Sequence, residues 1–462
     1  MVAVDVGALR SSPYTLDEGQ KYLAYLPHSG FHNQRIAFEN ALVLAHILNR
    51  TLLVPPVRLG NKPIRFMQFD NLHQALVLSG KEGLAHCTRV PIYIQLPYEC
   101  LEYYDYTHVS WDWLVNLTSI QVEQRLVYHE DLTFPWLENL GEADNTTFVL
   151  KDNGTYDFRF VDYEPSSVHT PYNKFMSLVP TSFLASSPAQ VIQLGTLFGS
   201  SRLRLINKTH IALRKRVRKS MAFSNQLLVS TAKAASTLLG GQYLGAHVRI
   251  GDGKFKAFGS PNVRKVWYKL LTRALRYDLM DASALEQSFA GADAIAEPPV
   301  LTPDGPSLRT PHPPVPWPLP RKFSPRLPCR GALHTATSLM HLNIPLFVST
   351  DSPDPSADPL LALFLRTFPC TFFLSDVLPA LQRQLLRDYD LTNNSKYGSA
   401  NIDHLLNRYD GVPLKPFLLP FMDAMIVGNA WGISGTDDST FSAFVEDVLW
   451  RTYHGWEIVQ RG

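Results

Sequence analysis

Apolar runs alternate with helix-like patterns near the start of the chain. The segment KYLAYLP at residues 21–27 is typical of a strand, residues 33–49 place apolar side chains at helical spacing, and TLLVPP at 51–56 is typical of a second strand. Two strands joined by a crossover helix run parallel in one sheet. We therefore predict an α/β fold for this part of the chain.

The same alternation returns in the second half. A helix is expected at about residues 225–239, and an apolar strand opens the segment YLGAHVRIGD at Tyr243. The segments at 344–355 and 417–455 continue the pattern, whereas residues 100–215 mix polar and aromatic stretches that predict no clear elements. We predict an N-terminal tail at 1–20, a first α/β domain at 21–238 and a second at 239–462.

One segment departs from this pattern. Residues 297–328 contain 12 of the 34 prolines of the chain. Such a density excludes helix and central strand and favours an extended insertion on the surface of the second domain. A partner that recognises proline-rich segments is the alternative to a tolerated insertion.

Charge and hydropathy exclude several classes of protein. The 462 residues carry a net charge of +2, which disfavours a nucleic-acid partner or an anionic membrane surface. No run of about twenty apolar residues is present, so we expect no transmembrane segment. The first residues show no signal peptide, and we expect an N-terminal targeting segment to be missing from this sequence.

Sequons point to a secretory history. Ordinary Ser and Thr usage predicts roughly two or three Asn-x-Ser/Thr sequons by chance. The chain has six, which favours passage through the secretory pathway. They lie at Asn49, Asn116, Asn145, Asn153, Asn207 and Asn393.

The four cysteines are compatible with disulfides. Cys87, Cys100, Cys329 and Cys370 form no CxxC pair and have no zinc-site spacing. Three connectivities are possible, and a Cys87–Cys100 bridge would close a short loop worth about 3 kcal/mol. Four free thiols in a cytosolic protein are the alternative.

The first strand runs into the polar loop HSGFHNQR at residues 28–35. Loops after parallel strands lie at the carboxyl edge of the sheet, where ligands bind, and the following helix offers free backbone N–H groups. Gly30 allows close backbone approach, so the loop is a candidate phosphate cradle. It matches neither GxGxxG nor GxxxxGK[ST], and an ordinary strand, turn and helix is the alternative.

The second half carries two further polar motifs. His247, Arg249 and Asp252 follow or end an apolar strand, and alternate positions place His247 and Arg249 on one face. The segment GTDDSTFS at 435–442 puts small hydroxyls at a helix start, where they cap the helix or meet phosphate.

In this order, the segments resemble the GDP-fucose protein O-fucosyltransferase family. The resembling residues are HSGFHNQR with LNRTLLVPP, HVRIGD, FVSTDS at Phe347 and MDAMIVGNAWGISGTDDSTFSAF. The middle of the first domain and the proline-rich segment are not covered. The resemblance implies a GT-B fold, in which two Rossmann-like domains face each other across a cleft and the second domain holds most of GDP-fucose.

The resemblance also implies roles for individual residues. It makes Arg249 and Asn33 catalytic, with Arg249 on the phosphates, and places the Asp423 carboxylate against guanine, whose N–H donors a carboxylate accepts. The implied donor-binding residues are Gly30, Phe31, His247, Arg249, Asp252, Asp351, Asp423, Ser439, Thr440 and Phe441.

The catalytic base stays open. Some members of the family carry a glutamate just before the motif glycine, where this chain has Ser29. The acceptor proton could pass to His28, His32 or Asp252, or to the departing phosphate. Glu39 is expected to face solvent or to form a salt bridge.

The resemblance implies transfer of fucose with inversion from GDP-fucose to a Ser or Thr hydroxyl of a protein, in the endoplasmic reticulum or Golgi lumen. We expect no cofactor and no obligatory metal, and interpret the acidic string at 388–390 as solvated. The alternatives are a glycan-directed fucosyltransferase and a catalytically silent relative that binds GDP-sugar or peptide. The aromatic stretch at 98–113 is a candidate acceptor surface or simple packing.

Overall fold

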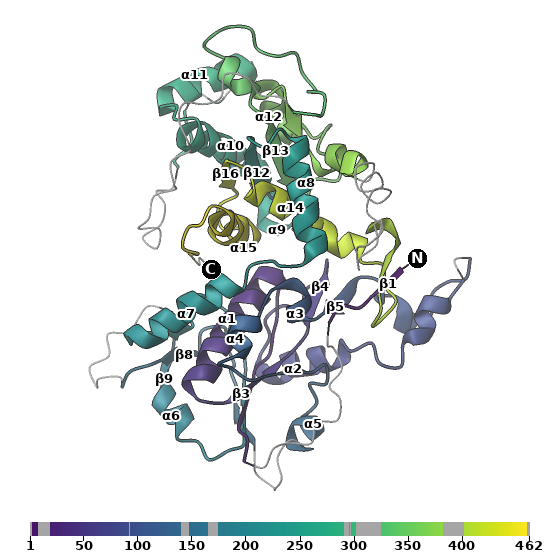
Figure 1. Ribbon diagram of the computed structural model, residues 1–462, viewed down its shortest axis with the longest axis vertical. Coiled ribbons are helices and arrows are strands. Elements are labelled where there is room, and N and C mark those ends of the chain that lie inside the picture. The colour runs from purple at the N-terminus through teal and green to yellow at the C-terminus, as the bar shows by residue number, and fades with distance from the viewer. Residues whose placement is uncertain are drawn as a thin grey trace. The chain divides into compact units, whose positions relative to one another are not determined.

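The structure is a computed structural model of the chain (Figure 1). It describes residues 2–7, 19–91, 93–139, 147–164, 174–290, 295, 297–301, 325–381 and 402–459. These residues divide into two compact units. The first runs to Asn225 and includes Ile402–Phe417; the second begins at Gln226 and includes the residues from Leu418 onward.

Short strands and helices build both units, and the strands pair in parallel except β4 with β5. The strands are β1 Val2–Val4, β2 Tyr22–Ala24, β3 Thr51–Val54, β4 Val57–Gly60, β5 Tyr106–Val109, β6 Leu126–Tyr128, β7 Thr147–Leu150, β8 Phe158–Val161, β9 Ser177–Pro180, β10 Val191–Leu194, β11 Leu203–Arg204, β12 Leu244–Val248, β13 Leu346–Thr350, β14 Thr371–Phe372, β15 Leu405–Asn407 and β16 Gly432–Gly435. The helices are α1 Phe31–Ile47, α2 Phe69–Leu78, α3 Trp111–Leu114, α4 Thr118–Gln121, α5 Phe134–Asn139, α6 Thr181–Ala185, α7 Lys208–Ser220, α8 Gln226–Leu238, α9 Gly253–Ala257, α10 Gly259–Lys269, α11 Leu279–Ala290, α12 Ala362–Thr367, α14 Lys415–Gly428, α15 Thr440–Ala443 and α16 Arg451–Tyr453. The predicted α/β class is confirmed.

The main sheet of the first unit has the order β6-β3-β2-β10-β7, and all its strands are parallel. The predicted strand, helix, strand sequence is confirmed as β2, α1 and β3. Helix α1 contacts both strands, and its residues from Phe31 to Ala45 are buried except Asn33. A helix enclosed to this extent sits within the core, and only Asn33, His46 and Ile47 are partly exposed.

Burial of α1 decides between the two expectations for Glu39. Glu39 faces neither solvent nor a surface partner, because its side chain is fully buried. Its Oε1 accepts a hydrogen bond from Arg218 Nε of α7 at 2.7 Å, and Arg35 Nη1 lies 4.0 Å from Oε2. The expected salt bridge therefore exists inside the first unit, where α1 packs on α7.

The second unit contains a parallel sheet of order β14-β13-β12-β16. The register pairs His247 with Ser349 on one side and with Gly435 on the other, so the carboxyl ends of β12, β13 and β16 lie level. Helix α10 contacts β12 and β16. Helix α14 runs so close to β12 that a Cβ at Gly245 would lie 2.9 Å from Val427 Cγ1.

Several predictions lie partly or wholly outside the described residues. These include most of the 1–20 tail, residues 302–324 of the proline-rich segment and the acidic string at 388–390. The GT-B arrangement and the predicted domain limits stay predictions. No described helix combines the length and apolar character needed to cross a membrane.

Two disulfides connect the four cysteines. Cys87 is bonded to Cys100, and Cys329 to Cys370. The alternative of four free thiols is therefore wrong. The first bridge closes the loop that follows α2, and the second ties the segment before β13 to the start of β14.

Candidate functional site

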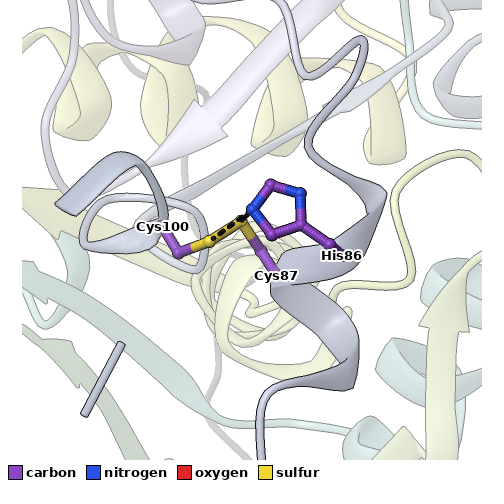
Figure 2. Close-up of side chains that lie close together, drawn as sticks. All are labelled: His86, Cys87 and Cys100. Atoms are coloured by element: carbon purple, nitrogen blue, oxygen red, sulfur yellow. Dashed lines mark hydrogen bonds between the residues drawn. A yellow bond between two sulfur atoms is a disulfide. The ribbon is translucent and has the colours of Figure 1, made fainter. Parts of the chain in front are cut away.

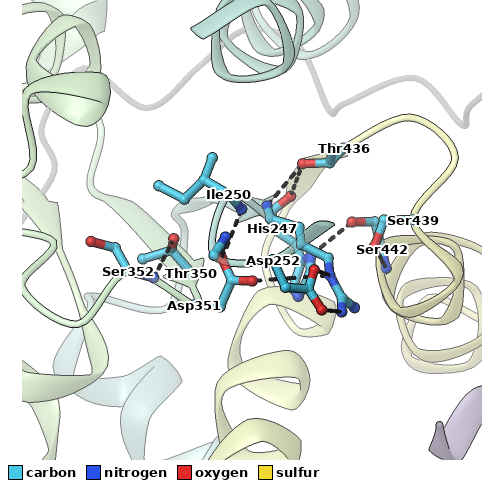
Figure 3. A network of polar contacts seen from close by, with 11 residues as sticks. His247, Ile250, Asp252, Thr350, Asp351, Ser352, Thr436, Ser439 and Ser442 are labelled. Atoms are coloured by element: carbon cyan, nitrogen blue, oxygen red, sulfur yellow. Dashed lines mark hydrogen bonds and ion pairs between the residues drawn. The ribbon is translucent and has the colours of Figure 1, made fainter. Parts of the chain in front are cut away.

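The carboxyl edge of the second sheet holds a tightly bonded loop. Asp351, which follows β13, accepts hydrogen bonds at Oδ1 from the backbone N–H of Ile250 at 2.7 Å and of Gly251 at 2.9 Å (Figure 3). On the other side, Thr436, which follows β16, accepts at Oγ1 from the backbone N–H of Arg249 at 3.0 Å. Two neighbouring strand ends thus fix the backbone that carries Arg249.

The Arg249 guanidinium is paired but accessible. Nη2 lies 2.8 Å from Asp252 Oδ2, and Nε lies 3.2 Å from Asp252 Oδ1 and 3.9 Å from Asp351 Oδ2. About 30% of the Arg249 side chain and 64% of the Asp252 side chain are exposed. Such an exposed ion pair contributes little free energy, so an anion can compete with Asp252 for the Arg249 guanidinium.

His247 lies behind this loop as a neutral imidazole. It is buried, its Nδ1 is 2.7 Å from Ser442 Oγ, and its ring centroid is 5.4 Å from that of Phe441. Burial, and then the positive charge of Arg249, lower the pKa of His247 to about 4. Its role is to connect β12 to the helix that begins at α15.

That helix begins beside the same strand ends. Ser439 caps α15, because its Oγ accepts a hydrogen bond from the Ser442 N–H at 3.2 Å. The helix continues through a π-helical segment, Phe444–Trp450, into α16. The backbone N–H groups of Thr440 and Phe441 occupy the first turn, where N–H groups lack intrahelical acceptors and bind anions readily.

Asp423 of α14 presents a buried acceptor. Its side chain is 9% exposed, and its Oδ1 has no hydrogen-bond partner within the described residues. Burial raises the pKa of Asp423 to about 7, although the Ser349 hydroxyl and the Thr350 backbone, at the end of β13, oppose the rise. An unpaired buried acceptor costs about 1–3 kcal/mol, which is typical of a site that a ligand completes.

In the first unit, the motif loop precedes α1. Gly30 is extended, and an added Cβ would meet nothing within 4 Å, so the protein itself does not require glycine there. Asn33 Oδ1 is buried and has no hydrogen-bond partner among the described residues. Phe31 is buried and stacks on Phe223 with ring centroids 5.6 Å apart, which is a packing role.

A pocket of about 40 Å³ opens at the carboxyl ends of β2, β3 and β6. His28 and Ser29 follow β2, and Glu130 follows β6. Its polar walls also include Arg58, His108 and Tyr409. A second pocket, of about 250 Å³, shares Glu130 and Tyr409 and extends along residues 81–89. Sequence patterns do not predict either pocket. Residues 409–411 line the second pocket, and Tyr409 also lines the first, but they lie far along the chain from the other lining residues.

The aromatic stretch at 98–113 divides into two groups. Tyr103 and Trp111 are buried, and the Tyr103 hydroxyl donates to the Asp410 carbonyl at 2.7 Å. Tyr98, at 89% exposure, and Tyr104, at 41%, present their rings to solvent. Packing therefore explains the first group, and the second remains available to an acceptor.

Figure 2 shows a group that resembles a metal site in composition. His86 Nε2 lies 3.5 Å from Cys100 Sγ and 3.8 Å from Cys87 Sγ. Both sulfurs belong to one disulfide, so neither is a thiolate, the form that binds metal. Within the described ranges, no other three His, Cys, Asp or Glu side chains lie close enough to share an ion.

The chain is similar to known proteins over a short stretch. No protein-family model matches the chain. A stretch of 39 residues is 64% identical to O-fucosyltransferase 30 of Arabidopsis thaliana. The chain resembles O-fucosyltransferases. The resemblance predicted from the motifs is confirmed over this stretch, which spans 8% of this chain and 8% of the relative.

Solved structures give a looser similarity. Crystal structures of POFUT1 in complex with GDP and with GDP-fucose align with 11% and 12% identity and TM-scores of 0.39 and 0.37. Each alignment covers 96% of this chain and 98% of the other.

Proposed function

We propose that the chain transfers fucose, with inversion, from GDP-fucose to a Ser or Thr hydroxyl of a protein acceptor. The supporting observation is the arrangement at the carboxyl edge of the second sheet. Arg249 follows β12, the capped start of α15 comes a few residues after the neighbouring β16, and Asp423 of α14 lies against Ser349 and Thr350 at the end of β13.

The guanine and the diphosphate of GDP each have a matching group there. Guanine presents N–H donors, and Asp423 Oδ1 is an acceptor with no hydrogen-bond donor among the described residues. The diphosphate carries negative charge, which the helix start at Ser439 and the two-pronged Arg249 guanidinium bind favourably. His247, being neutral, adds no competing charge and supports the helix through Ser442.

The same groups favour the transition state. As the bond between fucose and the β-phosphate breaks, negative charge grows on the departing oxygen while the sugar becomes oxocarbenium-like. Donors aimed at that oxygen strengthen as the reaction proceeds, so they accelerate it. Arg249 supplies the positive charge that stabilises this oxygen, so no metal ion is obligatory. The catalytic role that the family resemblance implies for Asn33, in the first unit, stays a prediction.

A secretory location fits the covalent features of the chain. The two disulfides are typical of an oxidising compartment. Four of the six sequons lie in the described residues, and all four asparagines are exposed, as glycosylation requires. These sites are Asn49, Asn116, Asn153 and Asn207.

Nucleotide selectivity tests the donor assignment. Calorimetric titration with GDP, UDP and ADP should show binding of GDP at least tenfold tighter than that of UDP, because uracil lacks the paired donors of guanine. Equal binding of GDP and UDP would overturn the assignment.

Labelled GDP-fucose then tests the reaction. Incubation with folded protein acceptors and with free glycans should label a protein Ser or Thr. Labelling of glycans alone would support the glycan-directed alternative. GDP binding with no turnover would support a silent relative, an alternative motivated by Ser29 in place of a glutamate.

A further inference from the structure

A buried lysine holds the β16–α15 loop, residues 435–439, which leads from the end of β16 to the start of α15. Lys269 is the last residue of α10, and its side chain is only 3% exposed. Its ammonium donates hydrogen bonds to the Gly435 carbonyl at 3.2 Å and to Asp437 Oδ1. Lysine is almost never buried to this extent unless it is paired. Lys269 therefore ties α10 to two residues of the loop.

The same loop carries two groups of the candidate donor site (Figure 3). Thr436 accepts at Oγ1 from the Arg249 N–H at 3.0 Å, and its own N–H donates to the His247 carbonyl at 3.1 Å. Ser439 donates its N–H to the Thr436 carbonyl at 3.3 Å, and its side chain caps α15. The position of this loop thus sets both the backbone of Arg249 and the helix start.

Gly435 has little room to move at the beginning of the loop. Its N–H donates to Glu446 Oε1 at 2.7 Å, and an added Cβ would lie 2.8 Å from Ser442 Cβ. Glu446 belongs to the helix that α15 begins, and the Gly435 carbonyl accepts from Lys269. The loop is therefore held between α10 and the helix to which it leads.

Asp437 places a negative charge near the expected position of the diphosphate. Only two residues separate it from Ser439, and two residues of backbone span at most about 7 Å. That distance is within the Debye length of about 8 Å at physiological ionic strength, so an uncompensated carboxylate would repel a diphosphate at the helix start. Lys269 compensates this charge, and the Asp437 side chain is only 28% exposed, so water screens the pair in part.

We propose that Lys269 is a positioning residue of the donor site. It fixes the β16–α15 loop, and it neutralises Asp437 so that the end of the loop accepts a diphosphate. The inference rests on the proposed function, and it requires no contact between Lys269 and GDP. Every residue that it uses belongs to the second unit.

A second ion pair on the loop is exposed. Lys254 lies 3.3 Å from Asp438, and the two side chains are 57% and 80% exposed. Exposed pairs of this kind contribute little, because water and salt screen them. The loop therefore depends on the buried Lys269 rather than on Lys254.

The affinities for GDP and guanosine together test this role. Guanosine carries the base without the phosphates, so the ratio of the two affinities reports the contribution of the diphosphate. Lys269→Met keeps the length of the aliphatic chain and removes the ammonium. It should weaken GDP binding about tenfold or more, with guanosine binding within about twofold of the parent. Guanosine should be unaffected because Asp423, its proposed acceptor, lies on α14 outside the loop. Calorimetry measures GDP, and ligand-observed NMR suits the weaker guanosine.

Neutralising Asp437 distinguishes charge from packing. The double variant Lys269→Met/Asp437→Asn removes the uncompensated carboxylate and should recover about threefold or more of the lost GDP affinity. Asp437→Asn alone keeps an acceptor oxygen for Lys269 and leaves the lysine charge uncompensated, so GDP should bind about threefold more tightly. This single variant changes a partly exposed residue, so it tests the charge even if Lys269→Met does not fold. Weaker or unchanged GDP binding in Asp437→Asn, or no recovery in the double variant, would overturn the proposal.

The matched control is Arg264→Met, on the same helix. Arg264 Nε lies 2.5 Å from Glu286 Oε1, and these side chains are 11% and 4% exposed, so the variant also breaks a buried ion pair. It should lower Tm and keep the parental ratio of GDP to guanosine affinity. A parental ratio in Lys269→Met, or equal losses of GDP and guanosine binding, would show that Lys269 supports only the fold and would overturn the inference. Absence of GDP binding by the parent protein would instead overturn the proposed function.

Discussion

Asp351 Oδ1 lies 2.9 Å from the backbone nitrogen of Gly251, and a Cβ added at Gly251 would lie 2.9 Å from Oδ2 of the same carboxylate. Glycine is therefore required here by close approach, since any side chain would displace Asp351. Because Asp351 also accepts from Ile250, its displacement would release the loop that carries Arg249.

Gly251→Ala should thus lower turnover of GDP-fucose by about tenfold to a hundredfold through misplacement of Arg249. The fold should survive, because the loop lies at the sheet edge. Asp351→Asn keeps one oxygen for the two N–H groups and should lose less than Asp351→Ala. Steady-state kinetics and Tm on the three variants check this, and parental kinetics in Gly251→Ala would contradict it.

GDP affinity should depend on pH through Asp423. The pKa of this carboxyl is raised to about 7, and only the carboxylate accepts from the N–H donors of guanine. Calorimetric affinity should therefore fall, by up to tenfold per pH unit, as pH drops below 7. Asp423→Asn should bind GDP about 1–3 kcal/mol more weakly and should lose the Asp423 part of the pH dependence. If the GDP affinity of the two proteins changed with pH in the same way, Asp423 would be excluded as the guanine acceptor.

The same group should oppose stability at high pH. A carboxyl whose folded pKa exceeds its unfolded value of 3.8 binds more protons when folded, so its contribution declines as pH rises from about 4 to 7. Asp423→Asn should therefore be more stable than the parent at pH 8 and nearly equal at pH 4. Urea unfolding at both pH values measures this. A variant less stable than the parent at pH 8 would show that the Asp423 carboxylate stabilises the fold.

Local patterns predict the helices and strands but not which of them contact one another. The β2, α1 and β3 order, the α8 helix and the apolar β12 strand follow from periodicity that each segment carries within itself. The pairing of Asp351 with the loop after β12 spans about 100 residues and depends on strand order, which no periodicity specifies. Sequence motifs thus single out Arg249 and Asp423 as candidates but do not show that Asp351 fixes the backbone of the loop that carries Arg249.

Glu39 shows a different limit. A charged residue in an amphipathic pattern is usually solvated, so the local sequence favours exposure or a salt bridge and does not specify burial. It is buried because α7 covers α1 and brings Arg218, from 179 positions away, to the carboxylate. Local patterns likewise do not predict the contact of Thr196 with His28, which is 168 positions away.

Glu39→Gln should destabilise the first unit strongly. The change leaves the buried Arg35 and the partly buried Arg218 without their shared carboxylate, and breaking a buried ion pair costs about 3–5 kcal/mol. Asp105→Asn, which removes an exposed ion pair with Lys62, is the matched control and should cost about 0–1 kcal/mol. Urea unfolding gives both values, and equal losses would contradict the burial argument.

Arg249→Lys should separate binding from catalysis. Arg249 presents a planar fork that already spans the two oxygens of Asp252, a geometry that also matches two phosphate oxygens. Lysine keeps the charge but supplies one compact ammonium, so the contact that strengthens as the phosphate departs is lost. We expect kcat to fall about a hundredfold or more, with GDP affinity changed much less and Tm nearly unchanged.

The control for this experiment is Lys254→Gln, which removes an exposed charge, 3.3 Å from Asp438, close to the same loop. It should leave kcat near the parental value, because general electrostatic attraction adds little at an exposed site. If Arg249 served only its salt bridge to Asp252, Arg249→Lys and Arg249→Ala would lower Tm slightly and keep normal specific activity in the folded fraction. That pattern would remove Arg249 from the reaction and leave the start of α15 as the remaining phosphate contact.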